Sequence, residues 1–397
     1  MSRERMVQDM PTKLVAVDTQ QEAGQQTDET MILGSREALM TVEQVIERTK
    51  EWVGIQAEQL PGFLGAHLMG GITSMAPSDP FPAYRDVDLH IILRDDVDLP
   101  GENAEALYKG LMIEAGFRRQ KDYCTPEVVL ADPVIASHMA VPSVLRDDSG
   151  FLTWLHETVA REYARRIWVQ TRCDAEKREA FGKLELAAHI PNRVSALSLL
   201  GYAGTYVSAV LALASLKAIT GRRSYVQMHC ILESWGRTDL YERLLEVIGL
   251  AQTSREQAER YLQDAAEAFA IAVQVKRTPH PFGHKMYAHL RPYLVEGSRE
   301  MIRDGYYREA VGWTMAFYCS SMQIIQIDAS SEITSDMQAK FCEFMRQFGL
   351  DGAIPWEERI EQAYAIFREV FLLADEIIAR NPAIFDENGE QQRTKVC

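Results

Sequence analysis

The segment DVDLHIIL at positions 86–93 constrains the fold most strongly, because charged and apolar side chains alternate in it as in a half-buried β-strand. Residues two apart on a strand point the same way, so Asp86 and Asp88 should project together. Adjacent carboxylates repel each other, and the pKa of one rises unless a cation lies between them. Mg²⁺ is the simplest such cation, since proteins hold it through one or two carboxylates plus substrate phosphates. The segment therefore predicts a strand that carries a metal site.

Two further features extend this pattern. Gly70 and Gly71 precede the two aspartates, and a glycine pair lets a phosphate chain approach the backbone closely. Glu127 opens the apolar segment 127–131, which we read as a strand beside the first. Three carboxylates from neighbouring strands can hold two metal ions, which clamp the attacking and leaving oxygens of a phosphoryl displacement. The same glutamate at a strand start could also be ordinary solvated surface.

The chain of 397 residues exceeds the usual size of a single hydrophobic core, so we expect two domains. The fold class expected is α+β, with a small mixed β-sheet domain followed by an all-α helical bundle. The predicted boundaries are a flexible N-terminal segment 1–34, a sheet domain 35–150, a helical domain 151–380 and a polar tail 381–397.

Within the sheet domain the pattern predicts a helix that is capped by Ser35 and ends at Pro61–Gly62. Strands are expected over 63–69, 87–93, 117–120 and 127–131, and a second helix over 102–115, closed by Gly116. The long loop 73–85 between two core strands is unusual, and such loops are commonly functional or mobile.

The net charge of −15 argues against a sequence-independent grip on nucleic acid, which needs a basic face. Six scattered cysteines and a polar N-terminus without an apolar signal segment favour a reducing, cytoplasmic location. The uncharged segment 194–216 is long enough to span a bilayer. It is rich in small and polar residues and bounded directly by Arg193 and Lys217, so we expect a buried core helix and no membrane association.

The order of glycine pair, alternating aspartates and a later acid resembles the nucleotidyltransferase superfamily, whose fold is that of DNA polymerase β. The matching residues are Gly70–Gly71, Asp86-Val87-Asp88 and Glu127, within about residues 63–131. A small catalytic domain followed by a helical domain is similar to the antibiotic (aminoglycoside-type) nucleotidyltransferases. The helical half matches only in general architecture.

The resemblance implies roles for these residues. Asp86 and Asp88 would bind Mg²⁺, two ions in all, and through the metal the triphosphate of an NTP, most simply ATP. Glu127 would complete the metal site or act as general base on the acceptor hydroxyl. The amides of Gly70 and Gly71 would reach the β- and γ-phosphates.

The chain departs from the family pattern at the glycines. Gly-Gly replaces the commoner Gly-Ser, and the hydroxyl of Thr73 or Ser74 could compensate. The spacing between the glycines and the aspartates is also longer than usual, and an insertion in a surface loop costs little stability.

The helical half offers cations for the phosphates. Lys217 is the preferred candidate for nucleotide binding because it ends a long apolar run near the expected core. Arg222 and Arg223 could bind phosphate, but they fit equally well as cations that stabilise a helix C-terminus. The remaining candidates are Lys276 and Lys285.

The predicted function is Mg²⁺-dependent transfer of an NMP group from an NTP to a hydroxyl of a small acceptor, an antibiotic or a metabolite, with release of pyrophosphate. Transfer to protein or RNA, as in toxin-type members of the superfamily, is an alternative that the acidic charge weakens for RNA. A non-catalytic nucleotide-binding protein of the same fold is another. The sequence leaves open a homodimer and the identity of the general base.

Overall fold

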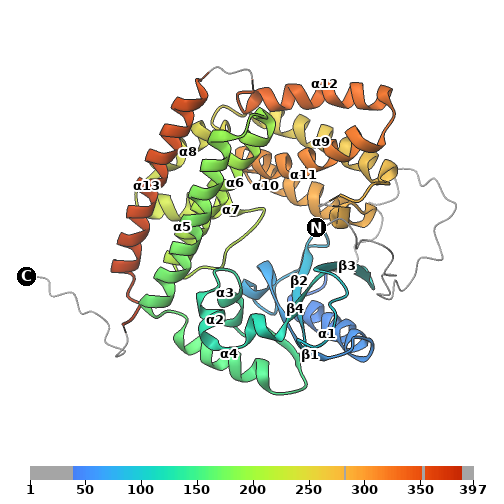
Figure 1. Ribbon diagram of the computed structural model, residues 1–397, viewed down its shortest axis with the longest axis vertical. Helices are drawn as coiled ribbons and strands as arrows, with labels where there is room; N and C mark the ends of the chain where they lie inside the picture. The colour runs from blue at the N-terminus through green and yellow to red at the C-terminus, as the bar shows by residue number, and fades with distance from the viewer. Residues whose placement is uncertain (1–38, 281–282, 351–353, 387–397) are drawn as a thin grey trace, which may run out of the picture.

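The computed structural model describes residues 39–280, 283–350 and 354–386. The segment 1–34, the predicted Ser35 cap and the tail beyond residue 386 lie outside the described residues. The protein is of the α+β class, with a mixed sheet followed along the chain by long helices (Figure 1).

The sheet has five strands in the order β3-β4-β2-β1-β5. Strand β2 pairs in parallel with β4, and the other neighbours pair antiparallel. The strands are β1 (Phe63–Leu68), β2 (Asp86–Leu93), β3 (Asn103–Tyr108), β4 (Leu111–Arg119) and β5 (Val144–Asp147).

Alternation along the strands divides the sheet into two faces. Val87, Leu89 and Ile91 of β2 are buried and pack in one hydrophobic cluster with helix α1 (Val42–Gln59). The other face carries Ile92, which packs in a separate cluster with α2 (Pro126–Ala131), α3 (Ile135–Met139) and α4 (Phe151–Glu162). Asp86 and Asp88 share this second face, at the end of β2 that these short helices leave uncovered.

Helix α1 begins seven residues later than Ser35 because Thr41 caps it. The Thr41 hydroxyl accepts a hydrogen bond from the Gln44 amide, and the Gln44 side chain accepts one from the Thr41 amide, which together form a capping box. The long loop before β2 is anchored here, because the Phe81 amide donates to the Met40 carbonyl and the Phe81 ring is buried.

The helix predicted over 102–115 is wrong, since the chain there forms the hairpin β3–β4. Lys109 and Gly110 both have positive φ, at 48° and 77°, and make a two-residue turn between Tyr108 and Leu111. Such turns match the twist of antiparallel strands and favour glycine. Pairing of β4 with β2 outweighs the helical propensity of the alanines and glutamates. Of the strand predicted over 117–120, residues 117–119 form the end of β4, and Gln120 begins the short helical turn η2 (Gln120–Tyr123).

The strand predicted over 127–131 is also wrong, because these residues belong to helix α2. Thr125 caps this helix by accepting a hydrogen bond from the Val128 amide, and Pro126 occupies its first turn. A capping residue followed by proline is a helix start, and the apolar run after it suits a short buried helix as well as a strand.

Long helices make up the rest of the described chain. They are α5 (Arg166–His189), α6 (Arg193–Ala214), α7 (Ser224–Ser234), α8 (Thr238–Ile248), α9 (Arg255–Val275), α10 (Gly297–Arg303), α11 (Tyr307–Asp328), α12 (Ser331–Gln347) and α13 (Trp356–Arg380). Short helical turns η3 (Gly283–Lys285) and η5 (Pro292–Glu296) lie between α9 and α10. We call residues 39–162 the sheet region and residues 163–386 the helical region.

Helix α6 is the one described helix that is long and apolar enough to cross a membrane. Two thirds of its apolar window, 67%, is buried inside the protein, and its most extensive packing is against α5. A helix that is apolar on all sides is buried either in protein or in lipid. In this structure, neighbouring helices bury most of the apolar surface of α6.

Buried and exposed charges join these elements. Arg172 of α5 is fully buried and donates to the Leu130 carbonyl at 2.8 Å and the Tyr163 carbonyl at 2.7 Å, which ties the helical region to α2.

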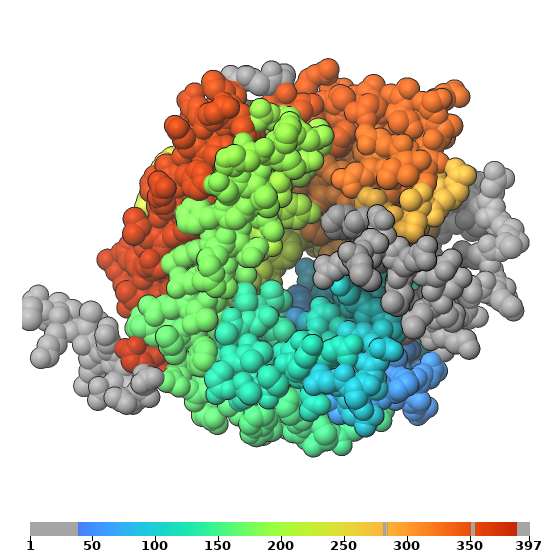
Figure 2. Space-filling model, viewed as in Figure 1, coloured from blue at the N-terminus to red at the C-terminus, as the bar shows by residue number. Residues whose placement is uncertain are grey.

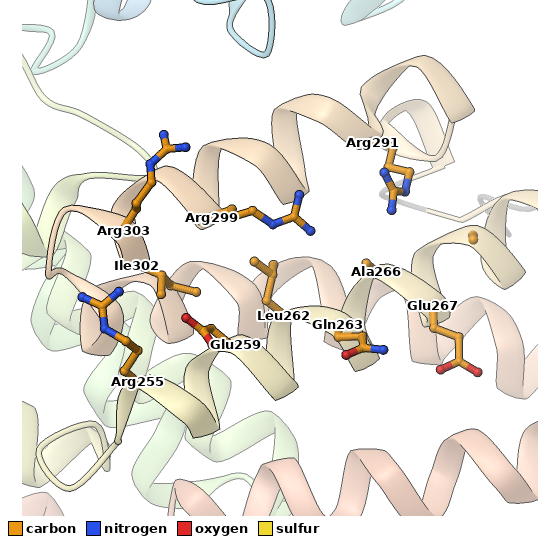
Figure 3. Close-up of a pocket in the computed structure, with 11 residues that line it drawn as sticks. Arg255, Glu259, Leu262, Gln263, Ala266, Glu267, Arg291, Arg299, Ile302 and Arg303 are labelled. Atoms are coloured by element: carbon orange, nitrogen blue, oxygen red, sulfur yellow. The ribbon is translucent and has the colours of Figure 1, made fainter. Parts of the chain in front are cut away.

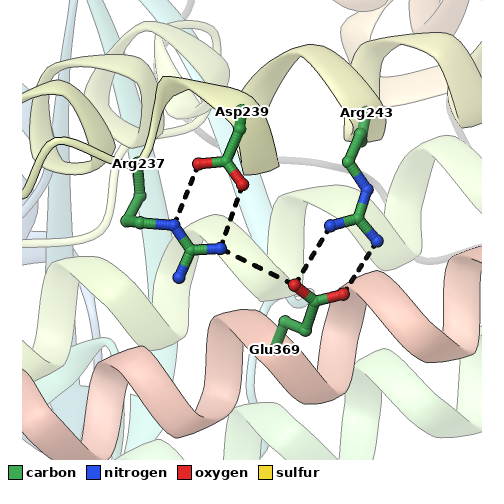
Figure 4. A network of polar contacts seen from close by, with 4 residues as sticks. All are labelled: Arg237, Asp239, Arg243 and Glu369. Atoms are coloured by element: carbon green, nitrogen blue, oxygen red, sulfur yellow. Dashed lines mark hydrogen bonds and ion pairs between the residues drawn. The ribbon is translucent and has the colours of Figure 1, made fainter.

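On the surface, an ion-pair network that we call the α8–α13 network links α8 to α13 through acidic and basic side chains (Figure 4). Its members are Arg237, Asp239, Arg243 and Glu369.

Candidate metal centre

Three carboxylates meet at one end of the sheet, on the face that also carries Ile92. Oxygen atoms of Asp86, Asp88 and Glu114 all lie within 4.8 Å of one another. Asp86 and Asp88 are two residues apart on β2, and the parallel register places Glu114 of β4 directly beside Asp88. The prediction that the two aspartates point the same way is confirmed. The third carboxylate of the group is Glu114, which the sequence analysis did not identify.

A fourth acid extends the row across the next strand. Glu105 of β3 is the cross-strand partner of Glu114, and its side chain is only 2% exposed. Lys285 of η3 reaches this pair from the helical region. Its Nζ lies 2.7 Å from Oε1 of Glu105 and also forms an ion pair with Glu114. We call Asp86, Asp88, Glu105 and Glu114 the carboxylate row.

The charges of the row are unbalanced, because four carboxylates face one ammonium group. Burial, and next the charge of Glu114, raise the pKa of Asp86 to about 6. Burial and then the charge of Asp86 raise the pKa of Asp88 well above its usual range. Burial also raises the pKa of Glu105 to about 7, against the opposing effect of Lys285. The row therefore holds more negative charge than its protein neighbours compensate.

The residues of the row fit a divalent cation. Oδ2 of Asp86 is buried and has no hydrogen-bond partner among the described residues, and a buried polar atom of this kind calls for a ligand. Carboxylate oxygens from two or three side chains are the donors that Mg²⁺ and Mn²⁺ prefer. A cation bound here would supply the charge that Lys285 alone does not.

The glycine pair packs directly against the row. Gly70 has a positive φ of 65°, and a Cβ built on it would lie 2.0 Å from Oδ2 of Asp88. The Met69 amide donates to the Asp88 carbonyl at 2.7 Å, so the turn after β1 is fixed to β2 at the same point. A Cβ on Gly71 would meet no atom within 4 Å. Of the two glycines, only Gly70 packs so closely against the Asp88 carboxylate that a side chain there would collide with it.

The hydroxyls of Thr73 and Ser74 stabilise this turn. Thr73 Oγ1 donates to the Gly70 carbonyl and Ser74 Oγ to the Gly71 carbonyl, each at 2.9 Å. Nδ1 of buried His138 lies 3.1 Å from Thr73 Oγ1, and since that hydroxyl donates to Gly70, the histidine nitrogen donates to it. The two hydroxyls thus fix the backbone that faces Asp88.

Beyond Asp88 on the same face of the sheet lies a chain of neutral polar groups. Nδ1 of His67 donates to the Leu68 carbonyl at 3.0 Å, because a carbonyl can only accept. Nε2 of His67 then accepts from the Tyr123 hydroxyl at 2.8 Å, and that hydroxyl accepts from Nδ1 of His90 at 2.6 Å. Burial lowers the pKa of His67 to about 3 and that of His90 well below its usual value.

Glu127 does not belong to the group of three carboxylates, as it lies in the first turn of α2 and is exposed. A hydrogen bond with Thr125 lowers the pKa of its carboxyl group. The expectation that Glu127 lies on a strand beside the aspartates is wrong, because the Thr125–Pro126 helix start turns the segment away from the sheet ladder. Lys217, the preferred candidate for nucleotide binding, follows α6 and is exposed.

Arg222 is the second cation close to the row, and its charge lowers the pKa of Asp86 against the larger effect of burial. Its guanidinium donates to the Tyr293 carbonyl at 2.6 Å and lies 4.8 Å from the centre of the Tyr293 ring. Together with Lys285 it brings the helical region over the carboxylates. Figure 2 shows a hollow between the teal sheet region and the green helices α5 and α6.

A second concave feature lies in the helical region. A groove of about 790 Å³ runs between α9 and α10 (Figure 3). Four arginines contribute to its lining, although the chain as a whole is acidic. They are Arg255, Arg291, Arg299 and Arg303, and Glu259 and Glu267 also take part.

No protein-family model matches this chain, and no curated protein matches it closely enough to count as a relative.

Proposed function

We propose that the protein is a divalent-metal-dependent nucleotidyltransferase, which moves an NMP group from an NTP to a hydroxyl of a small acceptor and releases pyrophosphate. One observation carries this proposal: Asp86, Asp88 and Glu114 converge on one sheet face, with the Gly70 turn packed against Asp88. Loose phosphoryl-transfer transition states need positioning and charge stabilisation more than covalent help.

Each residue near the row then has a distinct task. Asp86, Asp88 and Glu114 would hold the metal, most simply two Mg²⁺ ions, and bound metal neutralises charge that develops on the phosphoryl oxygens. Lys285 and Arg222 are the cations within reach of the phosphates. The Gly70 turn brings backbone amides beside the metal ligands without an intervening side chain. ATP is the first nucleotide to test.

The domain layout follows from the same proposal. Residues 35–150 would form the catalytic domain and residues 151–380 the domain that binds the acceptor. The site lies between them, since Lys285 and Arg222 come from the helical region and the carboxylates from the sheet. Acidic walls suit a cationic acceptor such as an aminoglycoside, which the electrostatic field would attract.

The direct test measures pyrophosphate release by the full chain with Mg²⁺, each of the four NTPs and a panel of hydroxylated small molecules. The double variant Asp86→Asn/Asp88→Asn should abolish release, and Glu127→Gln should retain it because Glu127 is exposed and outside the row. Absence of NTP binding, together with identical behaviour of the double variant and the wild type, would reject the proposal.

A phosphate-bearing target such as RNA is a second candidate acceptor. The groove between α9 and α10 favours it, because four arginines line one site in a chain of net charge −15 (Figure 3). NTP binding without consumption of any small acceptor would direct the search to this class. Arg299→Met/Arg303→Met should then reduce labelling of RNA by [α-³²P]NTP and leave NTP binding unchanged.

A further inference from the structure

We propose that Lys285 is a built-in substitute for the metal: it neutralises the carboxylate row in the metal-free protein and leaves Glu114 when a divalent cation binds. The inference concerns how the site is regulated, and it rests on the metal-binding part of the proposed function. Its geometric basis is a lysine from one region of the molecule inserted among the acids of another.

Lys285 occupies the position where a counter-cation is needed. Its Nζ pairs with Glu114, one of the three converging carboxylates, and with Glu105 on the neighbouring strand. Asp86 and Asp88 receive no ion pair from it, and Oδ2 of Asp86 has no hydrogen-bond partner among the described residues. The ammonium group therefore pairs only with the glutamate side of the row, and the aspartate side has no ion pair with it.

A divalent cation and the Lys285 ammonium compete for Glu114. A metal that bridges Asp86, Asp88 and Glu114 needs an oxygen of Glu114 as ligand, and it places positive charge near Nζ of Lys285. Like charges repel, so the metal both removes an acceptor of the lysine and disfavours its position. Glu105 stays available to hold the displaced ammonium on the far side of the row.

The surrounding structure permits the side chain to move while its backbone stays fixed. Lys276 donates to the carbonyls of Gly283 and Met286, at 2.9 and 3.1 Å, and so clamps both sides of Lys285. Met286 is buried in the helical core. The Lys285 side chain itself is 25% exposed and has four flexible carbons, so its ammonium can swing without unfolding η3.

The first test uses the unmodified full chain. Lysine acetylation by sulfo-NHS-acetate, read by mass spectrometry, compares each lysine with and without saturating Mn²⁺ and with no nucleotide present. Lys285 should react several-fold faster with Mn²⁺, because the metal frees its ammonium from Glu114. Exposed Lys217 is the internal control and should react equally in both states. An unchanged rate at Lys285 would overturn the inference.

The second test measures Mn²⁺ affinity by electron paramagnetic resonance in wild type, Lys285→Met and the control Lys217→Met. Removal of a competing cation should tighten Mn²⁺ binding about tenfold, because the binding-competent state becomes fully populated. Lys217→Met should match the wild type. Unchanged or weaker binding by Lys285→Met would show that the lysine orients the ligands or is irrelevant to them. If this variant fails to fold, the acetylation result decides.

These outcomes separate the inference from the proposed function. If the metal releases Lys285 but no nucleotidyl transfer is detected, the exchange of Lys285 for the metal stands and the proposed activity is rejected. If transfer depends on Asp86 and Asp88 but the metal does not release Lys285, the proposed activity stands and the exchange is rejected. Equal Mn²⁺ binding by wild type and Asp88→Asn would place the metal elsewhere and remove both.

Discussion

Two groups of charged side chains differ in their balance of charge. In the α8–α13 network, two arginines face two acids across side chains that are 36–54% exposed (Figure 4). In the carboxylate row, four largely enclosed acids face two cations, Lys285, which pairs with two of them, and Arg222, whose charge lowers the pKa of Asp86. The balanced network is complete within the protein. The row is not balanced by the protein's own cations, and that imbalance favours binding of a cation from outside.

The two groups also differ in what builds them. Arg237 and Asp239 are neighbours two residues apart, whereas Asp88, Glu114 and Glu105 meet only through the register of three strands. Strand register is fixed by the buried face of a sheet, so the apolar residues behind the row position the acids in front. The site is therefore a product of the fold as a whole.

The largest effect expected is that of Glu114→Gln on transfer. If Glu114 is a metal ligand, as proposed, its loss removes several kcal/mol of transition-state stabilisation, so the rate of pyrophosphate release should fall about 100-fold or more. Glu127→Gln, in the exposed α2 turn, should stay within about twofold of wild type. If both variants lower the rate of pyrophosphate release equally, Glu114 in the row has no role that exposed Glu127 lacks.

Gly70→Ala should come next, with a loss of about 1–3 kcal/mol in the free energy of unfolding. Its φ is positive and the new Cβ would collide with the Asp88 carboxylate. Gly71→Ala is the matched control and should stay within about 1 kcal/mol, because its Cβ meets open space. Urea denaturation measures both, and a similar loss for both glycines would contradict the packing of Gly70 on Asp88.

Asp88→Asn should stabilise the metal-free protein, by about 1–2 kcal/mol, even though it removes a proposed ligand. The variant removes a buried charge that repels the charges of Asp86 and Glu114. After burial, these two charges are the largest causes of the raised pKa of Asp88. Urea denaturation in EDTA at pH 8 checks the sign. A destabilised variant would mean that the row is already compensated and resembles the surface network.

Metal binding should depend on pH in a defined direction. The pKa of Asp86 is raised to about 6 and that of Asp88 is raised as well, and a protonated carboxyl must lose its proton to bind a cation. Mg²⁺ should therefore raise the Tm by a few degrees at pH 8 and by much less at pH 5.5. Differential scanning fluorimetry measures this, with Asp86→Asn/Asp88→Asn expected to show no shift at either pH.

The smallest effect should come from Glu369→Gln in the α8–α13 network. Exposed ion pairs contribute about 0–1 kcal/mol each, and this glutamate pairs with both Arg237 and Arg243. The variant should lose up to about 1 kcal/mol at low salt and less at 1 M NaCl. If Glu369→Gln instead raises the free energy of unfolding, it acts in the same direction as Asp88→Asn, and the contrast between the network and the row is lost.

The sequence predicts one half of the row and misses the other, for a local reason. The alternation around Asp86 and Asp88 is self-contained, so the strand and its shared face follow from residues 86–93 alone. Glu105 and Glu114 lie in a segment rich in helix-forming residues, where the only local sign of a hairpin is Lys109–Gly110. Their pairing with β2 is a long-range contact that no local pattern encodes.

The same limit explains Glu127 and Lys285. A short apolar run after Thr125–Pro126 fits a strand or a buried helix equally, and tertiary packing decided for the helix. Lys285 was one of several basic candidates, and only the fold brings it to residues 171 and 180 positions earlier in the chain. The fold class is readable from the sequence; the type of each short element and its partners in the sheet are not.

Strand β2 carries acids and a histidine on one face, Asp86 and Asp88 followed by His90, and acidity affects them in opposite ways. Burial disfavours charge on all three, yet the acids become charged as protons leave and the histidine as a proton arrives. Stability that Asp86 contributes is lost as the pH rises from about 4 to 6, whereas stability from neutral His90 is lost as the pH falls below about 6.5. Between about pH 4 and 6 the two effects therefore oppose each other, so the charges of this one strand partly cancel in the pH dependence of the metal-free protein's stability.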